Sequence, residues 1–109
     1  QVIINIINNS KDAFVHNSIL IREIKINTKK EDKFAVIEIE DNAGGIKLKS
    51  IYKIFEPYFT TKHTSQGTGL GLFMSKMICE QGFHGFLDVK TYKNTSKFII
   101  KLPLEEKNA

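Results

Sequence analysis

The chain has 109 residues, 41% of them apolar, and a net charge of +4 that arises from sixteen basic and twelve acidic residues. This length and composition predict one globular domain with its own core and exclude a disordered segment. The lysines are spread along the chain rather than gathered into a basic tract, which argues against nucleic acid as a partner.

The first predicted element is a helix over residues 1–14. One broad arc of this helix is apolar and comprises Val2, Ile3, Ile6, Ile7, Ala13 and Phe14. The opposite arc comprises Asn5, Asn8, Asn9 and Asp12. Because Asn is a poor helix former, and a solvated face is filled better by Glu, Lys or Gln, this stripe indicates a face that meets a ligand.

Two strands follow, over residues 20–28 and 34–41, and a charged turn over residues 29–33 joins them. In the second strand, alternation predicts an inward face, and it places Asp41 on that face together with Ala35, Ile37 and Ile39. A buried carboxylate without a donor is costly. We therefore expect Asp41 to meet either a protein donor or a ligand.

The middle of the chain contains a short amphipathic turn, a loop and a second helix. Apolar residues recur over residues 48–55, and a polar, hydroxyl-rich loop without period spans residues 58–66. The helix is expected to begin at Thr68 or Gly69 and to end at Gln81. Its predicted inward residues are Leu70, Phe73, Met74, Met77 and Ile78.

A hairpin completes the predicted elements, with strands over residues 86–92 and 98–104 and a turn over residues 93–97. Strands that tight turns can join imply an antiparallel or mixed sheet, and the helices are expected to stack on one face of it. The predicted fold class is therefore α+β, in the form of a two-layer α/β sandwich.

A glycine-rich run, GTGLGL over residues 67–72, stands where the polar loop becomes a helix. Such glycines let a backbone approach an anion at a helix N-terminus. The residues alone leave a merely flexible loop equally open. The spacing differs from that of a Walker loop, and the His-Arg-Asp and Asp-Phe-Gly triplets of protein kinases do not occur.

Two other groups of polar residues point to a nucleotide. In the run DNAGGI, over residues 41–46, the inward carboxylate of Asp41 precedes a glycine turn and can accept a hydrogen bond from an exocyclic amine such as that of adenine. A plain turn is the alternative for this run. In the first helix, a side-chain oxygen from Asn5, Asn9 or Asp12 can complete a Mg²⁺ shell that phosphates and water otherwise fill.

Together these runs resemble the N, G1, F and G2 boxes of sensor histidine kinases. The boxes are NIINNSKDA over residues 5–13, DNAGGI over 41–46, IFEPYFTTK over 54–62 and GTGLGL over 67–72, and the ending LPL over 102–104 is also typical. Their order matches that of the family and spans nearly the whole chain. The resemblance implies a catalytic and ATP-binding domain with the Bergerat fold, a two-layer α/β sandwich with a mixed, mostly antiparallel sheet and its helices on one face.

The resemblance also implies roles for single residues. Asn9 is expected to coordinate Mg²⁺, Asp41 to accept from the adenine amino group, and Gly45 to lie against the base. Lys62, within the expected ATP lid over residues 58–66, is expected to contact the terminal phosphate. The implied catalytic residues are Asn5, Asn9 and Lys62. The implied ATP-binding residues are Asn5, Asn9, Asp12, Asp41, Gly45, Ile46, Tyr58, Thr61, Lys62, Gly67, Thr68, Gly69, Leu70, Gly71 and Ser96.

Three positions depart from patterns found among the relatives. Ala43 and Thr95 each stand where family members usually have glycine. Relatives that hydrolyse ATP carry a glutamate one helical turn before the metal-binding asparagine, and Asn5 occupies that position here. An amide is no general base near neutral pH, so slow hydrolysis and transfer to a partner's nucleophile are expected.

The resemblance implies a protein histidine kinase that donates the γ-phosphoryl group of ATP to a histidine on a separate dimerisation domain, with a response regulator downstream. His16, His63 and His84 lack the following Glu or Asp that usually marks an acceptor histidine. Two alternatives stay open. One is a nucleotide sensor without catalysis, and the other is an ATP-hydrolysing member of the same superfamily.

Residues 1–109 are expected to form a single domain of a longer protein, because the chain lacks an initiator Met. By resemblance, the first strand and the upstream dimerisation domain are not included, and the domain is cytoplasmic and monomeric whereas the full kinase is a homodimer. The single Cys79 excludes an intramolecular disulfide and is expected in the core. No apolar run approaches the roughly 18 residues of a membrane span.

Overall fold

The computed structural model describes residues 1–59 and 70–104 of the chain. The elements in order are α1 (Val2–His16), β1 (Ile24–Glu31), β2 (Phe34–Asp41), the 3₁₀ helix η1 (Leu48–Ser50), α2 (Gly71–Met77), the π-helical η2 (Ile78–Gly82), β3 (Phe86–Tyr92) and β4 (Thr95–Pro103).

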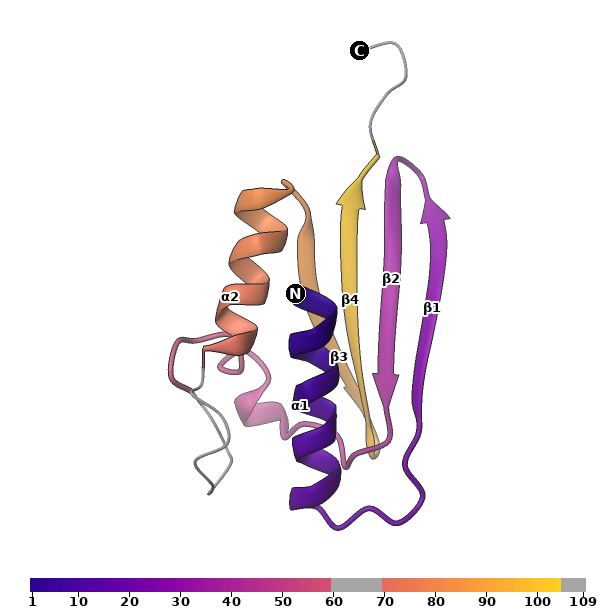
Figure 1. Ribbon diagram of the computed structural model, residues 1–109, viewed down its shortest axis with the longest axis vertical. Coiled ribbons are helices and arrows are strands. Elements are labelled where there is room, and N and C mark those ends of the chain that lie inside the picture. Colours follow the sequence, from indigo (N-terminus) through magenta and orange to yellow (C-terminus); the bar gives the residue numbers. More distant parts are fainter. Residues whose placement is uncertain (60–69, 105–109) are drawn as a thin grey trace.

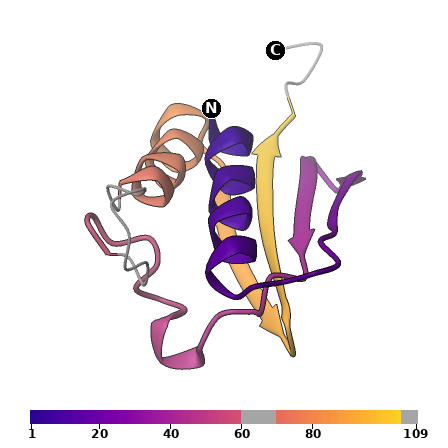
Figure 2. The same cartoon turned by 60° about the horizontal axis from the view of Figure 1, so that its bottom comes forward.

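The fold has two layers, a sheet and a pair of helices. The sheet has the order β1-β2-β4-β3, and each pair of neighbours within it is antiparallel. Figures 1 and 2 show α1 and α2 on one face of this sheet, with α1 over β3 and β4 and with β1 at the far edge. The predicted α+β sandwich with helices on one face is therefore confirmed.

The core lies between α1, α2 and the central strands. Its most buried side chains are Ile6, Ile39, Cys79, Leu87 and Phe98. The spacing of the buried residues explains why they meet. Residues four apart along α1 share one side of the helix, residues two apart along a strand share one face of the sheet, and these two sides face each other. The expected burial of Cys79 is confirmed, and burial raises the pKa of its thiol.

The first strand is displaced from its predicted position. β1 begins at Ile24 rather than at residue 20, and Leu20 is 95% exposed in the connection that precedes it. The reason is the register, because β1 pairs with the whole of β2 and the turn contracts to Asp32 and Lys33. Asp32 takes the left-handed φ of 58° that so tight a turn requires.

The second strand occupies the predicted residues, but its burial does not simply alternate. Ile39 and Asp41 are buried as predicted, whereas Ala35 and Ile37 are only partly buried. Val36, on the opposite face, is also buried. The prediction for this strand was therefore right about Asp41 and incomplete about its neighbours.

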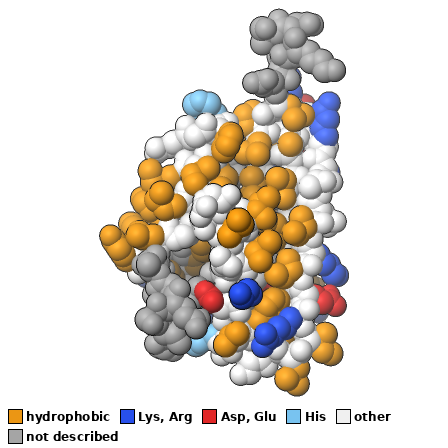
Figure 3. Space-filling view, viewed as in Figure 1, with side chains coloured by type: hydrophobic (Ala, Val, Ile, Leu, Met, Phe, Trp, Pro, Cys, Tyr) orange, Lys and Arg blue, Asp and Glu red, His pale blue; other side chains and the backbone are white. Residues whose placement is uncertain are grey.

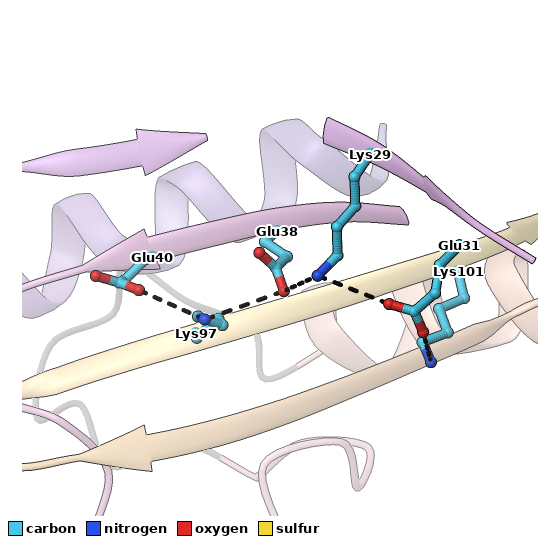
Figure 4. A network of polar contacts seen from close by, with 6 residues as sticks. All are labelled: Lys29, Glu31, Glu38, Glu40, Lys97 and Lys101. Carbon is cyan, nitrogen blue, oxygen red and sulfur yellow. Dashed lines mark hydrogen bonds and ion pairs between the residues drawn. The ribbon is translucent and has the colours of Figure 1, made fainter. Parts of the chain in front are cut away.

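Charged side chains cover the outer face of the sheet (Figure 4). Glu38 lies 3.7 Å from the ammonium of Lys29, and Glu40 lies 3.8 Å from that of Lys97. Lys101 donates a 3.1 Å hydrogen bond to Glu31, and this bond lowers the pKa of the Glu31 carboxyl. The stems of such long side chains can shield apolar neighbours, which explains why a valine on this face is buried.

The second helix is shorter and turned differently from the prediction. α2 begins at Gly71 and continues into η2 up to Gly82. Met74 is 46% exposed, and Met77 is also exposed, so their predicted inward orientation is wrong. Instead the buried residue of α2 is Ser75. Its small side chain meets α1, and that close contact between the helices determines which face turns inward.

Three smaller predictions differ from the structure only in detail. The turn of the last hairpin contains only Lys93 and Asn94, because β4 begins at Thr95, three residues before the predicted start. Residues 48–55 form the short η1 and a series of turns, from which Tyr52 projects with 90% exposure. In α1, which extends two residues beyond the prediction, Ile3 is exposed.

Apolar side chains also remain at the surface on the helix side of the sheet (Figure 3). They include Ile4 on α1 and Ile26 on β1, which are 58% and 51% exposed. Ile26 is exposed because the helices cover the opposite half of the sheet. Within residues 1–59 and 70–104, no helix is both long enough and apolar enough to span a bilayer.

Candidate functional site

The predicted carboxylate lies at the end of β2 and points into the helix side of the sheet. Asp41 is only 4% exposed. Its Oδ2 accepts a 2.5 Å hydrogen bond from the hydroxyl of Ser10, and its Oδ1 accepts a 3.0 Å bond from the backbone N–H of Ala43. The donor that the sequence required is thus supplied by the protein.

A second buried hydroxyl accompanies this carboxylate. Ser96 is the partner of Asp41 in the β2–β4 register, and it is buried. Asp41, Ser96 and Ser10 are three of the four buried polar residues in the described part of the chain, and all three belong to this end of the sheet or to the helix that crosses it. Buried polar side chains that gather in one place are typical of a ligand site.

The loop after Asp41 is tied to the last hairpin. The N–H of Gly44 donates to the carbonyl of Asn94 at 3.0 Å, and the N–H of Ile46 donates to Oγ1 of Thr91 at 2.9 Å. Gly45 has a φ of +73°, and a Cβ at this residue would lie 2.6 Å from the carbonyl oxygen of Lys93. The loop backbone therefore lies directly on the hairpin, and only glycine fits there.

Two asparagines hold the other side of this loop. Nδ2 of Asn17, at the end of α1, donates to the carbonyl of Ala43 at 2.6 Å. The side chain of Asn42 bonds to the carbonyl of Ile21 at 2.8 Å and accepts from the N–H of Glu23 at 2.9 Å. Ala43 itself is buried, so its methyl group is accommodated within this turn.

The asparagine stripe on α1 divides into two parts. Asn5 faces α2, where its Nδ2 donates to the carbonyl of Gly71 at 3.2 Å and to Oγ of Ser75 at 3.0 Å. Asn9, one turn later, is partly buried and precedes Ser10 directly. Among the described residues its amide makes no hydrogen bond. Its oxygen is therefore available to a ligand.

The donor set suits Mg²⁺ held in part by a ligand. The described residues include no cluster of three or more His, Cys, Asp or Glu that could hold a metal ion by themselves. Mg²⁺ commonly takes one or two protein oxygens and completes its shell with water and phosphate. A single amide oxygen from Asn9 fits that pattern.

The remaining predicted residues are only partly covered by the structure. Asp12, Ile46 and Leu70 are partly buried, Gly71 begins α2, and Tyr58 is exposed with a φ of 65°. The predictions for Thr61, Lys62, Gly67, Thr68 and Gly69, together with most of the expected lid, lie outside the described residues.

Sequence reasoning missed four residues that build this site. They are Ser10, Asn17, Asn42 and Thr91. Only Ser10 carried a signal, because a serine interrupts the apolar spacing from Ile6 to Phe14 and a hydroxyl at a buried helical position needs a partner.

Comparison with known proteins agrees with this geometry. Residues 1–106 match the family described as histidine kinase-, DNA gyrase B-, and HSP90-like ATPase. The two-component sensor PprA of Pseudomonas aeruginosa is 35% identical over 107 residues, which cover 95% of this chain and 12% of that protein. The sensor kinase CckA of Brucella abortus is 45% identical over 82 residues, covering 72% of this chain and 9% of that protein.

Solved structures agree as well. The catalytic domain of the histidine kinase ThkA, in a nucleotide-free form, superposes with a TM-score of 0.77 and is 28% identical, covering 94% of this chain and 65% of that one. The chain thus spans a small part of the two curated relatives and about two thirds of this solved domain. It belongs to the histidine kinase-, DNA gyrase B-, and HSP90-like ATPase family, as the ATPase-type domain of a sensor histidine kinase.

Proposed function

We propose that this domain binds ATP together with Mg²⁺ and donates the γ-phosphoryl group to a histidine on a separate dimerisation domain of the same kinase, for relay to a response regulator. The observation that carries the proposal is the buried carboxylate of Asp41 at the end of β2. It accepts a hydrogen bond from the hydroxyl of Ser10 and lies beside a loop in which only glycine fits at position 45. An acceptor in that position suits a base with an exocyclic amine.

The geometry around Asp41 supports recognition of adenine. A carboxylate offers about four lone-pair sites. Two of them are used by Ser10 and Ala43, so acceptor capacity remains for a ligand amine. Gly45 is proposed from the family resemblance to lie against the base, and its backbone is held beside Asp41 because the loop rests on the hairpin at Lys93.

Hydrogen bonds around Asn5 support transfer rather than hydrolysis. The Nδ2 group of Asn5 is engaged by Gly71 and Ser75, which ties it to the start of α2. An amide held in this way neither accepts a proton from water nor moves toward one. Phosphoryl transfer depends mainly on placement and charge neutralisation, and Mg²⁺ would supply the latter when bound.

Titration calorimetry of the chain tests the proposal. We expect saturable binding of ATP that strengthens when Mg²⁺ is present, hydrolysis near background, and transfer of labelled phosphate to an added dimerisation domain that carries the acceptor histidine. Absence of ATP binding would refute the proposal. Binding with steady hydrolysis would favour an ATPase, and binding without transfer would favour a nucleotide sensor. Sedimentation is expected to show a monomer.

Asn9→Ala is expected to weaken ATP binding in the presence of Mg²⁺ by about tenfold, or about 1.4 kcal/mol, because it removes the proposed amide ligand of the metal. Binding of ATP in the presence of a chelator should change little. Calorimetry in the two conditions measures this difference. Asn8→Ala is the matched control, since Asn8 is an exposed asparagine of the same helix. Equal losses with and without Mg²⁺ would remove Asn9 from the metal site.

A further inference from the structure

A serine occupies a position of α1 that the pattern assigns to the core. Ser10 lies midway between Ile6 and Phe14, four residues from each, on the buried stripe of the helix, and it is fully buried. Serine has no apolar side chain to contribute there and is a mediocre helix former. Its hydroxyl must therefore be explained by what it contacts.

The contact of Ser10 is the carboxylate proposed to recognise the base. Its Oγ lies 2.5 Å from Oδ2 of Asp41 and 3.3 Å from the carbonyl oxygen of Ile6. A hydroxyl has one hydrogen, and the shorter distance and the charge of the acceptor both direct it to Asp41. This bond connects residues 31 positions apart, one on the helix and one at the end of a strand.

Two donors thus hold the plane of the carboxylate. The Ala43 N–H engages Oδ1, and the Ser10 hydroxyl engages Oδ2. The last side-chain torsion of an aspartate has broad wells and is easily rotated. With a donor on only one oxygen, the carboxylate can turn and move its remaining lone pairs away from a ligand.

We propose that Ser10 is a positioning residue that determines selectivity for 6-aminopurine nucleotides, because it fixes the Asp41 carboxylate toward the exocyclic amine. This inference rests on the proposed function, since it assumes that ATP occupies the site. It adds a determinant of base specificity that lies on α1 immediately after the proposed metal ligand Asn9. Two adjacent residues of α1 would then serve the nucleotide, with Asn9 binding the metal and Ser10 orienting the carboxylate that binds the base.

The test compares ATP with purine riboside triphosphate, which differs in lacking the exocyclic amine. In the unaltered chain, ATP should bind more tightly. In Ser10→Ala, we expect ATP affinity to fall by about tenfold, while affinity for the analogue changes by less than about twofold. The ratio of the dissociation constant of the analogue to that of ATP should therefore decrease toward one. A partly unfolded sample lowers the active concentration for both nucleotides and leaves this ratio intact.

Three other variants complete the experiment. Ser10→Thr restores a hydroxyl and should restore the ratio. Ser75→Ala removes another fully buried serine hydroxyl, which bonds to Asn5 and Gly71 rather than to Asp41, and should keep the ratio of the unaltered chain. If Ser10→Ala does not fold, Ser10→Cys replaces it, because a thiol fills the space but is a weak donor.

The outcomes separate the two proposals. If the unaltered chain binds neither nucleotide, the proposed function fails and this inference falls with it. If ATP binds and the ratio in Ser10→Ala, or in Ser10→Cys where that variant is used, stays within about twofold of the original, the inference alone is overturned. A Ser10→Thr ratio that remains at the Ala level would also overturn it.

Discussion

Asp41→Asn is expected to weaken ATP binding by about a hundredfold, or about 2.7 kcal/mol. The substitution exchanges one carboxylate oxygen for an NH₂ group, so a donor replaces an acceptor where the proposed adenine amine would approach. The remaining oxygen can still accept from Ala43, which currently bonds to Oδ1 at 3.0 Å. The fold should therefore persist while recognition is lost, and calorimetric titration with ATP and Mg²⁺ measures the loss.

Glu40→Gln is the matched control for this prediction. Glu40 precedes Asp41 on β2 but belongs to the outer face, where it lies 3.8 Å from Lys97. Its substitution removes the same charge from the same strand, and ATP affinity should stay within about twofold, because an ion pair this exposed contributes little. Equal losses in the two variants would mean that net charge, rather than the position of Asp41, governs binding.

The site was predictable from the sequence where local period decides the structure. Alternation along β2 placed Asp41 on the buried face, and that placement is confirmed at 4% exposure. The asparagine stripe of α1 was also visible in the sequence, because spacings of three and four residues put its members on one side of a helix. Such patterns need no knowledge of which element packs against which.

The contacts between distant elements were not predictable in this way. The bond from Ser10 to Asp41 depends on the distance between α1 and the end of β2, which no local pattern encodes. The inward orientation of Met74 and Met77 was predicted wrongly for the same reason, since the approach of Asn5 to Ser75 turns a different side of α2 toward α1. The other predicted inward residues, Leu70, Phe73 and Ile78, are partly buried. Burial here follows helix packing rather than hydrophobicity alone.

Tight turns made of ordinary residues caused the errors in strand boundaries. Asp32 and Lys93 both take left-handed φ values, of 58° and 54°, in the turns of the two hairpins. The sequence carries no glycine at either place, so the usual marker of such turns is missing and longer loops were predicted. As a result the predicted bounds of β1 and β4 differ from those in the structure by a few residues, and the prediction placed Ser96 in a turn rather than in a strand.

Gly45→Ala should lower the free energy of unfolding by about 2 to 4 kcal/mol, the range expected when backbone strain and a steric clash combine. Gly45 has a φ of +73°, where an alanine is strained in any environment. Its new Cβ would also lie 2.6 Å from the carbonyl oxygen of Lys93 and 3.0 Å from Oγ1 of Thr91. The carbonyl belongs to the hairpin backbone and cannot swing aside as a flexible side chain can.

The loop must therefore separate from the hairpin, which would also break the 2.9 Å bond from the N–H of Ile46 to Thr91. Urea denaturation followed by circular dichroism measures the stability change.

Gly82→Ala is the control, because its φ is not left-handed and a Cβ there meets no described atom within 4 Å. Its effect should stay within about 0.5 kcal/mol. ATP affinity should also fall in Gly45→Ala at urea concentrations where the chain is still folded, since displacement of the loop would move the backbone beside Asp41. A Gly45→Ala chain as stable as Gly82→Ala would show that the loop does not rest on the hairpin.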